Sequence, residues 1–91
     1  MERALEKMME DITNAEGVTG CVFADQAGLC LGVKGTASAD SAGLIAAIAD
    51  QASKLQPGSE APTICLESDT RQCLIRREGP MIGAVYKNPT H

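Results

Sequence analysis

The spacing of apolar residues predicts an amphipathic helix in the first part of the chain. Apolar residues recur every three or four positions between Glu2 and Asn14, and most of the remaining positions are charged. This is the pattern of a helix with one buried face. Gly17 follows and suits the left-handed backbone conformation that ends many helices, so we expect the helix to stop before it. The apolar positions are Leu5, Met8, Met9 and Ile12.

Two short apolar runs follow, and they predict a β-hairpin. The first extends from Val18 to Asp25 and the second from Leu29 to Lys34. Gln26-Ala27-Gly28 separates them, and Gly28 can take the positive φ of a hairpin with a bulge. We therefore expect two antiparallel strands.

A second helix is predicted from about Ala39 to Leu55, with two different non-polar faces. Ser38 can cap its start, and Asp40 in the first turn interacts favourably with the helix dipole. The bulky stripe consists of Leu44, Ile45, Ile48 and Leu55, and the adjacent small stripe of Ala42, Ala46, Ala49 and Ser53.

Two interpretations of these stripes remain open. Alanine is a good helix former, so the small stripe can have no further meaning. Alternatively, the bulky stripe packs on the sheet while the small stripe lets another helix approach closely.

After a loop from Gln56 to Pro62, three more strands are predicted, over Thr63–Ser68, Arg71–Arg77 and Met81–Lys87. The order is thus α-β-β-α-β-β-β, which is typical of an α/β (α+β) domain. The chain has 91 residues, so we expect a single domain over residues 1–91.

Several predicted strands are apolar on both faces, as in Gly20–Ala24 and Met81–Val85. Five strands about 4.8 Å apart span roughly 24 Å, whereas a helix is about 10 Å across. Two helices, even one on each face, leave about half of the sheet uncovered. Such a surface favours association with another protein, although lax patterning in short strands is an alternative.

Composition and charge exclude several classes of function. The formal net charge is −4 and the eight Lys and Arg residues are scattered, so no basic surface for nucleic acid is expected. No stretch reaches the roughly 20 apolar residues of a membrane span, and the first residues lack the apolar segment of a signal peptide. These features predict a cytoplasmic protein.

The residues for catalysis or metal binding are few. The only histidine is His91, and no phosphate-binding or dinucleotide-binding glycine motif occurs. Cys21, Cys30, Cys65 and Cys73 lack the close pairing of zinc sites and are expected to be free thiols. We expect no enzyme, metal site or cofactor; a thiol nucleophile is the weakest alternative.

Several local sequences, taken in order, resemble the roadblock class of proteins, and within it a subunit of the Ragulator complex. Each fragment is weak by itself, but the fragments occur in the same order, and the resemblance extends over the whole chain. They are Leu5-Glu6, Glu10-Asp11, Asp25, Gly28-Leu29, Leu31-Gly32, Gly35-Thr36, Ser38, Ala42-Gly43, Ala52 with Lys54-Leu55, and Cys65-Leu66-Glu67-Ser68-Asp69.

The resemblance implies a five-stranded antiparallel sheet with one helix on each face. Roadblock modules pair through the second helix and the third strand, which joins two sheets into one. Many have a third helix after the last strand, whereas only Asn88–His91 follow it here. The partner interface implied on this sequence is Ala42, Ala46, Ala49 and Ser53 with Thr63, Ile64, Cys65, Leu66 and Glu67.

The resemblance also implies the partners and the location. It implies a heterodimer with another roadblock-type subunit and a long wrapping subunit that tethers the pair to the lysosomal membrane. The assembled complex would hold Rag GTPases there for amino-acid-dependent activation of TOR complex 1. Binding of a viral X protein is a further implied interaction.

A small-molecule-sensing domain of PAS or profilin-like type is the alternative function. A central sheet with helices on its faces can hold a ligand. The chain has one Phe, one Tyr and no Trp, however, and ligand pockets are usually lined by aromatic and convergent polar groups. The scaffold interpretation is therefore preferred.

Overall fold

The computed structural model describes residues 2–55, 57–58 and 62–89. Part of the predicted loop (residues 56 and 59–61) and His91 lie outside this range. The predicted order of elements is confirmed. The elements are α1 (Glu2–Thr13), β1 (Val18–Asp25), β2 (Cys30–Gly35), a 3-10 turn (Ala39–Ser41), α2 (Ala42–Ser53), β3 (Ile64–Glu67), β4 (Gln72–Glu78) and β5 (Met81–Lys87).

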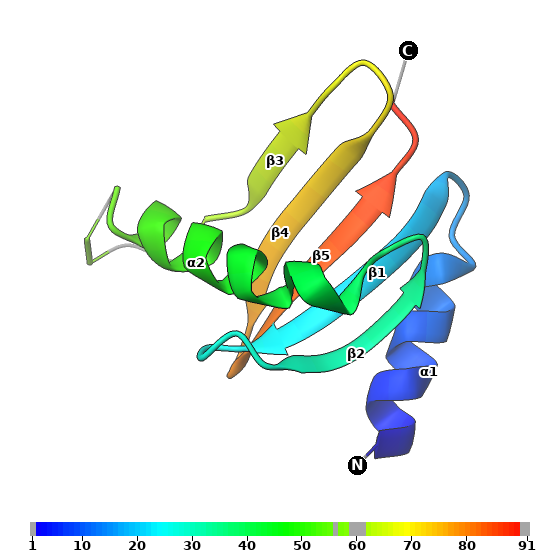
Figure 1. Cartoon of the computed structure of the whole chain (residues 1–91), viewed down its shortest axis with the longest axis horizontal. Helices are drawn as coiled ribbons and strands as arrows, with labels where there is room; N and C mark the ends of the chain where they lie inside the picture. The colour runs from blue at the N-terminus through cyan, green and yellow to red at the C-terminus, as the bar shows by residue number, and fades with distance from the viewer. Residues whose placement is uncertain (1, 56, 59–61, 90–91) are drawn as a thin grey trace.

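The five strands form one antiparallel sheet in the order β2-β1-β5-β4-β3 (Figure 1). β5 lies in the middle, where it pairs with β1 from Asp25↔Met81 to Val18↔Lys87 and with β4 on its other side. β2 and β3 are therefore the two edges. The fold predicted from the resemblance, with one helix on each face, is confirmed.

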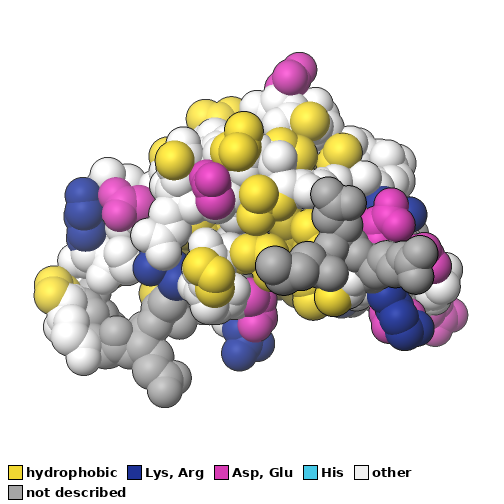
Figure 2. Space-filling model, turned by 90° about the horizontal axis from the view of Figure 1, so that it is seen from below, with side chains coloured by type: hydrophobic (Ala, Val, Ile, Leu, Met, Phe, Trp, Pro, Cys, Tyr) yellow, Lys and Arg dark blue, Asp and Glu magenta, His cyan; other side chains and the backbone are white. Residues whose placement is uncertain are grey.

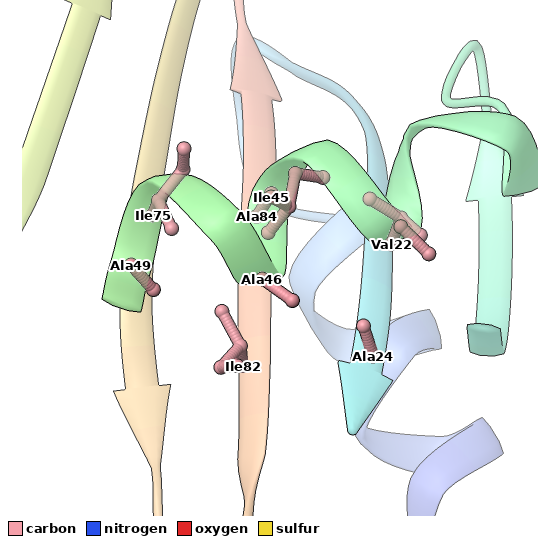
Figure 3. Packing of buried hydrophobic residues seen from close by; sticks show 9 residues of the cluster. Val22, Ala24, Ile45, Ala46, Ala49, Ile75, Ile82 and Ala84 are labelled. Carbon is pink, nitrogen blue, oxygen red and sulfur yellow. The ribbon is translucent and has the colours of Figure 1, made fainter. Parts of the chain in front are cut away.

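The helix α2 covers one face of the sheet. Ile45, Ala46 and Ala49 lie over side chains from β1, β4 and β5, and the whole cluster is buried (Figure 3). Burial of aliphatic side chains is the main stabilising contribution in so small a domain. The sheet side of the cluster consists of Val22, Ala24, Ile75, Ile82 and Ala84.

The helix α1 lies on the opposite face, against β1 and β2. Met9 packs there with Cys21 and Phe23, and the half-buried Leu5, Met8 and Ile12 surround them. Met9 reaches the sheet because Gly32 has no side chain: a Cβ on Gly32 would lie 2.7 Å from the Met9 Cε. α1 thus covers the β1–β2 half of its face.

The predicted turn residues act as expected. Gly28 has a φ of +91° in the β1–β2 turn, a conformation that favours glycine. The Asp25 Oδ1 accepts hydrogen bonds from the Ala27 and Leu29 N–H groups, both at 2.9 Å. The Ser38 Oγ accepts from the Asp40 N–H at 3.2 Å, so Ser38 caps the 3-10 turn that leads into α2.

Candidate protein interface

The outer face of α2 is apolar and open. Leu44 and Leu55 are 69% and 82% exposed, although they belong to a residue type that is usually buried. They border a shallow hollow of about 520 Å³ in which most of the surrounding surface is apolar. The hollow is lined by Leu44, Ala47, Ile48, Gln51, Ala52 and Leu55. This surface can bury a second apolar face.

Of the two interpretations of the α2 stripes, the one in which the bulky stripe packs on the sheet and the small stripe faces outward is wrong. Ala42, Ala46 and Ala49 are buried against the protein's own sheet, together with Ile45, so they cannot form an open surface for another helix. Ser53, the fourth member of the small stripe, is half-buried, and its Oγ donates to the Asp50 carbonyl at 2.7 Å. The open face of α2 is therefore the one that carries Leu44 and Leu55, the leucine face, and not the predicted small stripe.

The physical reason lies in the sheet beneath the helix. Val22, Ile75 and Ile82 are branched side chains that project toward α2 and are fully buried. A helix approaches such a surface closely only where its own side chains are small, so alanine faces the sheet. The spacing of 42, 45, 46 and 49 is itself that of one helix face, a signal that places Ile45 with the alanines rather than with Leu44.

The edge strand β3 is the other predicted part of the interface. Among the described strands it pairs only with β4, so its outer backbone groups face no strand. Ile64 is half-buried against the α2 core, whereas Leu66 is 45% exposed. Thr63, Cys65 and Glu67 are also exposed, and the Glu67 Oε2 accepts from the Gln72 Nε2 at 3.2 Å. An unblocked edge of this kind favours pairing with another strand.

A smaller hollow of about 200 Å³ lies at the far end of β3 from Ile64. Leu66, Cys73 and Tyr86 are aligned across β3, β4 and β5 and form its floor. The Arg71 guanidinium lies over the Tyr86 ring, 5.0 Å from its centroid, which favours a cation–π contact. Glu67 and Ser68 complete the lining.

The face that carries α1 is open toward β4 and β3. A groove of about 400 Å³ runs beside the helix, with Met8 and Ile12 on one wall and Leu74 and Val85 on the sheet side. Arg76 and Glu78 form an ion pair at 3.3 Å and also line the groove. Uncovered apolar surface thus occurs on both faces of the sheet.

The opposite edge of the sheet also exposes apolar side chains. Figure 1 places β2 along the lower side of the molecule, and the view from below shows hydrophobic side chains near the middle with charged groups on both flanks (Figure 2). Leu31 and Val33 of β2 are exposed, as is Leu29 in the turn before this strand. Leu31 has no residue opposite it, because Gly32 pairs with Phe23 and Cys30 with Ala24. Such a bulge interrupts the row of backbone groups and hinders strand addition.

Two of the cysteines, Cys21 and Cys73, do not resemble activated nucleophiles. Burial raises the pKa of the Cys21 thiol, and the nearby Lys34 only partly offsets this rise. Burial also raises the pKa of Cys73, partly offset by its hydrogen bond with Tyr86 and by the Arg71 charge. A raised pKa lowers the fraction of reactive thiolate. All four cysteines are free thiols.

The described residues show neither a cluster of metal ligands nor a membrane-spanning helix. Residues 2–55, 57–58 and 62–89 contain no group of three or more His, Cys, Asp or Glu side chains that could hold a metal ion. No helix within the same ranges is long and apolar enough to cross a membrane.

Comparison with known sequences identifies a family. The family model described as Ragulator complex protein LAMTOR5 matches residues 1–87. The "Ragulator complex protein LAMTOR5 homolog" of Nematostella vectensis is 42% identical over 91 residues, covering 99% of this chain and 100% of the relative. The LAMTOR5 protein of Xenopus tropicalis is 35% identical over 88 residues, covering 96% and 97%.

Comparison with solved structures supports the roadblock fold. Myxococcus xanthus MglB superposes with a TM-score of 0.84 at 15% identity, covering 96% of this chain and 71% of that one. The roadblock/LC7 domain from Streptomyces avermitilis gives a TM-score of 0.75 at 15% identity, covering 90% and 76%. At this identity the likeness concerns the fold alone. The alternative of a PAS or profilin-like sensor receives no support from these comparisons.

Proposed function

The chain belongs to the LAMTOR5 family of Ragulator complex proteins, and from this premise we propose that it is a non-catalytic scaffold subunit of a Ragulator-like complex. We propose that residues 1–91 act as one roadblock-like domain that pairs with another roadblock-type subunit. The membership of its relatives in a complex, stated in their names, supports this role.

The observation that carries the proposal is the exposed leucine face of α2 beside the unpaired edge β3. Burying one leucine contributes about 1.5–3 kcal/mol, and Leu44, in the middle of this face, remains mostly exposed in the single chain. A sister module that adds its third strand to β3 would extend the sheet, and its second helix would cover this face. Ile64, Cys65 and Leu66 would then contribute through backbone pairing.

The groove beside α1 is the proposed site of the wrapping subunit. Its apolar lining of Met8, Ile12, Leu74 and Val85 can bury an apolar segment on the face opposite α2. A chain bound there would not compete with the sister module. A Leu74→Glu variant should keep the sister module and lose the wrapping subunit during purification; retention of both would contradict this assignment.

The wider role follows from the family. We propose that the wrapping subunit tethers the pair to the lysosomal membrane, where the complex holds Rag GTPases for amino-acid-dependent activation of TOR complex 1. We also infer that the chain corresponds to the hepatitis B virus X-interacting protein, whose name implies the viral X protein as a partner. Failure of purified X protein to bind the assembled pair would remove that last inference.

Co-expression with each roadblock-type Ragulator subunit of the same organism, followed by native mass spectrometry, tests the main proposal. We expect a 1:1 heterodimer with one of them. Leu44→Asp should abolish it, because it introduces a charge into an apolar contact. Leu31→Asp is the matched control, since Leu31 is 41% exposed and lies on β2, the opposite edge strand. A monomer in every mixture would contradict the proposal.

A further inference from the structure

The C-terminal end of α2 extends past the edge of the sheet. α2 runs across the sheet and its last turn lies beyond β3 (Figure 1). Leu55, two residues after the end of the helix at Ser53, is 82% exposed, the highest value among the exposed large apolar side chains of the described residues. The single chain thus leaves an apolar side chain exposed just after the end of this helix.

The small hollow at the far end of β3 lies on the same face of the sheet as α2. Leu66, Cys73 and Tyr86 lie opposite one another across three strands, in the register Leu66↔Cys73 and Cys73↔Tyr86. They continue the side of the sheet on which Ile75 and Ala84 contact α2, because side chains alternate between faces along each strand. α2 covers the Ile64 end of β3 and leaves the Leu66 end open.

Symmetry relates these two features. Two modules that pair antiparallel through their β3 edges are related by an approximate two-fold axis perpendicular to the sheet. Such an axis exchanges the two ends of β3, so the overhanging end of the sister's second helix falls near Leu66 on this chain. The sister is a different chain, so the axis is only approximate, and it places the end of this chain's α2 near the equivalent end of the sister's third strand.

Arg71 supplies a positive charge beside the hollow. At the end of this chain's own α2, Lys54 follows the last turn directly and pairs with Asp50 at 3.4 Å, so this helix end already has a basic neighbour. Arg71 stands at the rim of the hollow, over Tyr86, with its Nη2 3.5 Å from the Thr36 Oγ1. A helix C-terminus that enters the hollow would bring its carbonyl groups toward this guanidinium.

We therefore propose that the hollow formed by Leu66, Arg71, Cys73 and Tyr86 receives the C-terminal turn of the sister module's second helix, with an apolar side chain seated on the floor and Arg71 facing the helix carbonyls. Leu55 occupies the equivalent hollow of the sister module. This inference rests on the proposed pairing and adds the pair of contacts that fixes its register.

Dissociation constants of the pair, measured for the co-purified sister subunit, test the contacts. Leu55→Ala should weaken pairing roughly 10-fold or more, because most of this leucine is exposed before pairing. Arg71→Ala should weaken it roughly 2- to 10-fold through loss of the favourable charge at the helix end. Leu29→Ala and Arg76→Ala, at the opposite edge and on the opposite face, should change it less than about twofold.

Alkylation of the native cysteines gives a second measurement that needs no substitution. Cys73 lines the hollow, so its reaction with an alkylating reagent should slow at least about tenfold in the pair compared with the single chain. Cys30 is also half-buried but lies on the far edge strand, and its rate should not change.

The outcomes separate this inference from the proposed function. A stable pair in which Cys73 reacts as fast as in the single chain, and in which Leu55→Ala behaves like Leu29→Ala, would overturn the inference while the pairing itself stands. Absence of any pair would overturn both. Protection of Cys73 together with weakening by Leu55→Ala would establish the reciprocal contact.

Discussion

Two adjacent residues of α2 should respond to the same substitution in different measurements. Leu44 is 69% exposed on the outer face, whereas Ile45 is 3% exposed and packs in the core between α2 and the sheet. Leu44→Ala should therefore affect pairing, and Ile45→Ala should affect the stability of the single chain. The comparison separates the interface from the core within one turn of helix.

The magnitudes follow from the exposed fractions. Full burial of a leucine contributes about 1.5–3 kcal/mol, and 69% of Leu44 remains to be buried. Its truncation should thus weaken pairing by about 1–2 kcal/mol, or roughly 5- to 30-fold in the dissociation constant. Truncation of a buried isoleucine costs about 2–5 kcal/mol, which lowers the melting temperature of a domain this size by at least roughly 8 °C.

Urea denaturation followed by circular dichroism measures the stability term, because the chain has no Trp for fluorescence. Leu44→Ala should leave the midpoint of unfolding within experimental error of the parent. A Leu44→Ala midpoint that falls as far as that of Ile45→Ala would refute the assignment of the two faces. So would a dissociation constant for Leu44→Ala within twofold of the parent value.

Three further substitutions test the fold, each by urea denaturation. Gly83→Ala should cost about 1–3 kcal/mol, because its Cβ would lie 2.6 Å from the Phe23 ring. Gly43→Ala, inside α2 and with no atom within 4 Å, should instead stabilise the chain by about 0.5–1 kcal/mol; equal effects of the two substitutions would contradict this. Asp25→Ala should cost about 1–2 kcal/mol through loss of two hydrogen bonds to backbone N–H groups, and an unchanged midpoint would count against that role. Burial raises the pKa of Cys21 above its ordinary value of 9.0, so the folded state keeps this proton to higher pH than the unfolded state. The resulting stability is complete below about pH 9 and is lost as pH rises through the raised pKa. The urea concentration at the midpoint of unfolding should therefore decrease as the pH is raised above about 9, and it should decrease less in Cys21→Ala. An identical fall in both proteins would rule out Cys21 as the cause.

Most of the architecture could be predicted from local sequence. The bounds of β1 and β5, Val18–Asp25 and Met81–Lys87, are those predicted, because glycine, charged or proline residues limit both apolar runs. β3 is shorter than predicted, since only Ile64–Glu67 pair with β4. An edge strand has one neighbour to define its length, so its ends depend on tertiary pairing.

The candidate site was less predictable. The sequence shows two non-polar stripes on the second helix but does not say which one meets the sheet. That choice depends on Val22, Ile75 and Ile82, which come from three strands and meet beneath α2 only in the folded chain. The hollow at Leu66 and Arg71 likewise requires the register of β3, β4 and β5, which no local pattern contains.

The central position of β5 has a consequence for biosynthesis. β1 and β2 form one hairpin and β3 and β4 another, and only β5 joins the two into one sheet. Until residues 81–87 have left the ribosome, neither hairpin has a complete set of neighbours, and such non-local pairing is slow compared with hairpin formation. The edge β3 that meets the sister module is thus secured to the rest of the sheet only when synthesis has passed β5. Pairing through this edge should accordingly follow the synthesis of β5, and a subunit made in excess of its partner would expose its leucine face to chaperones and proteases.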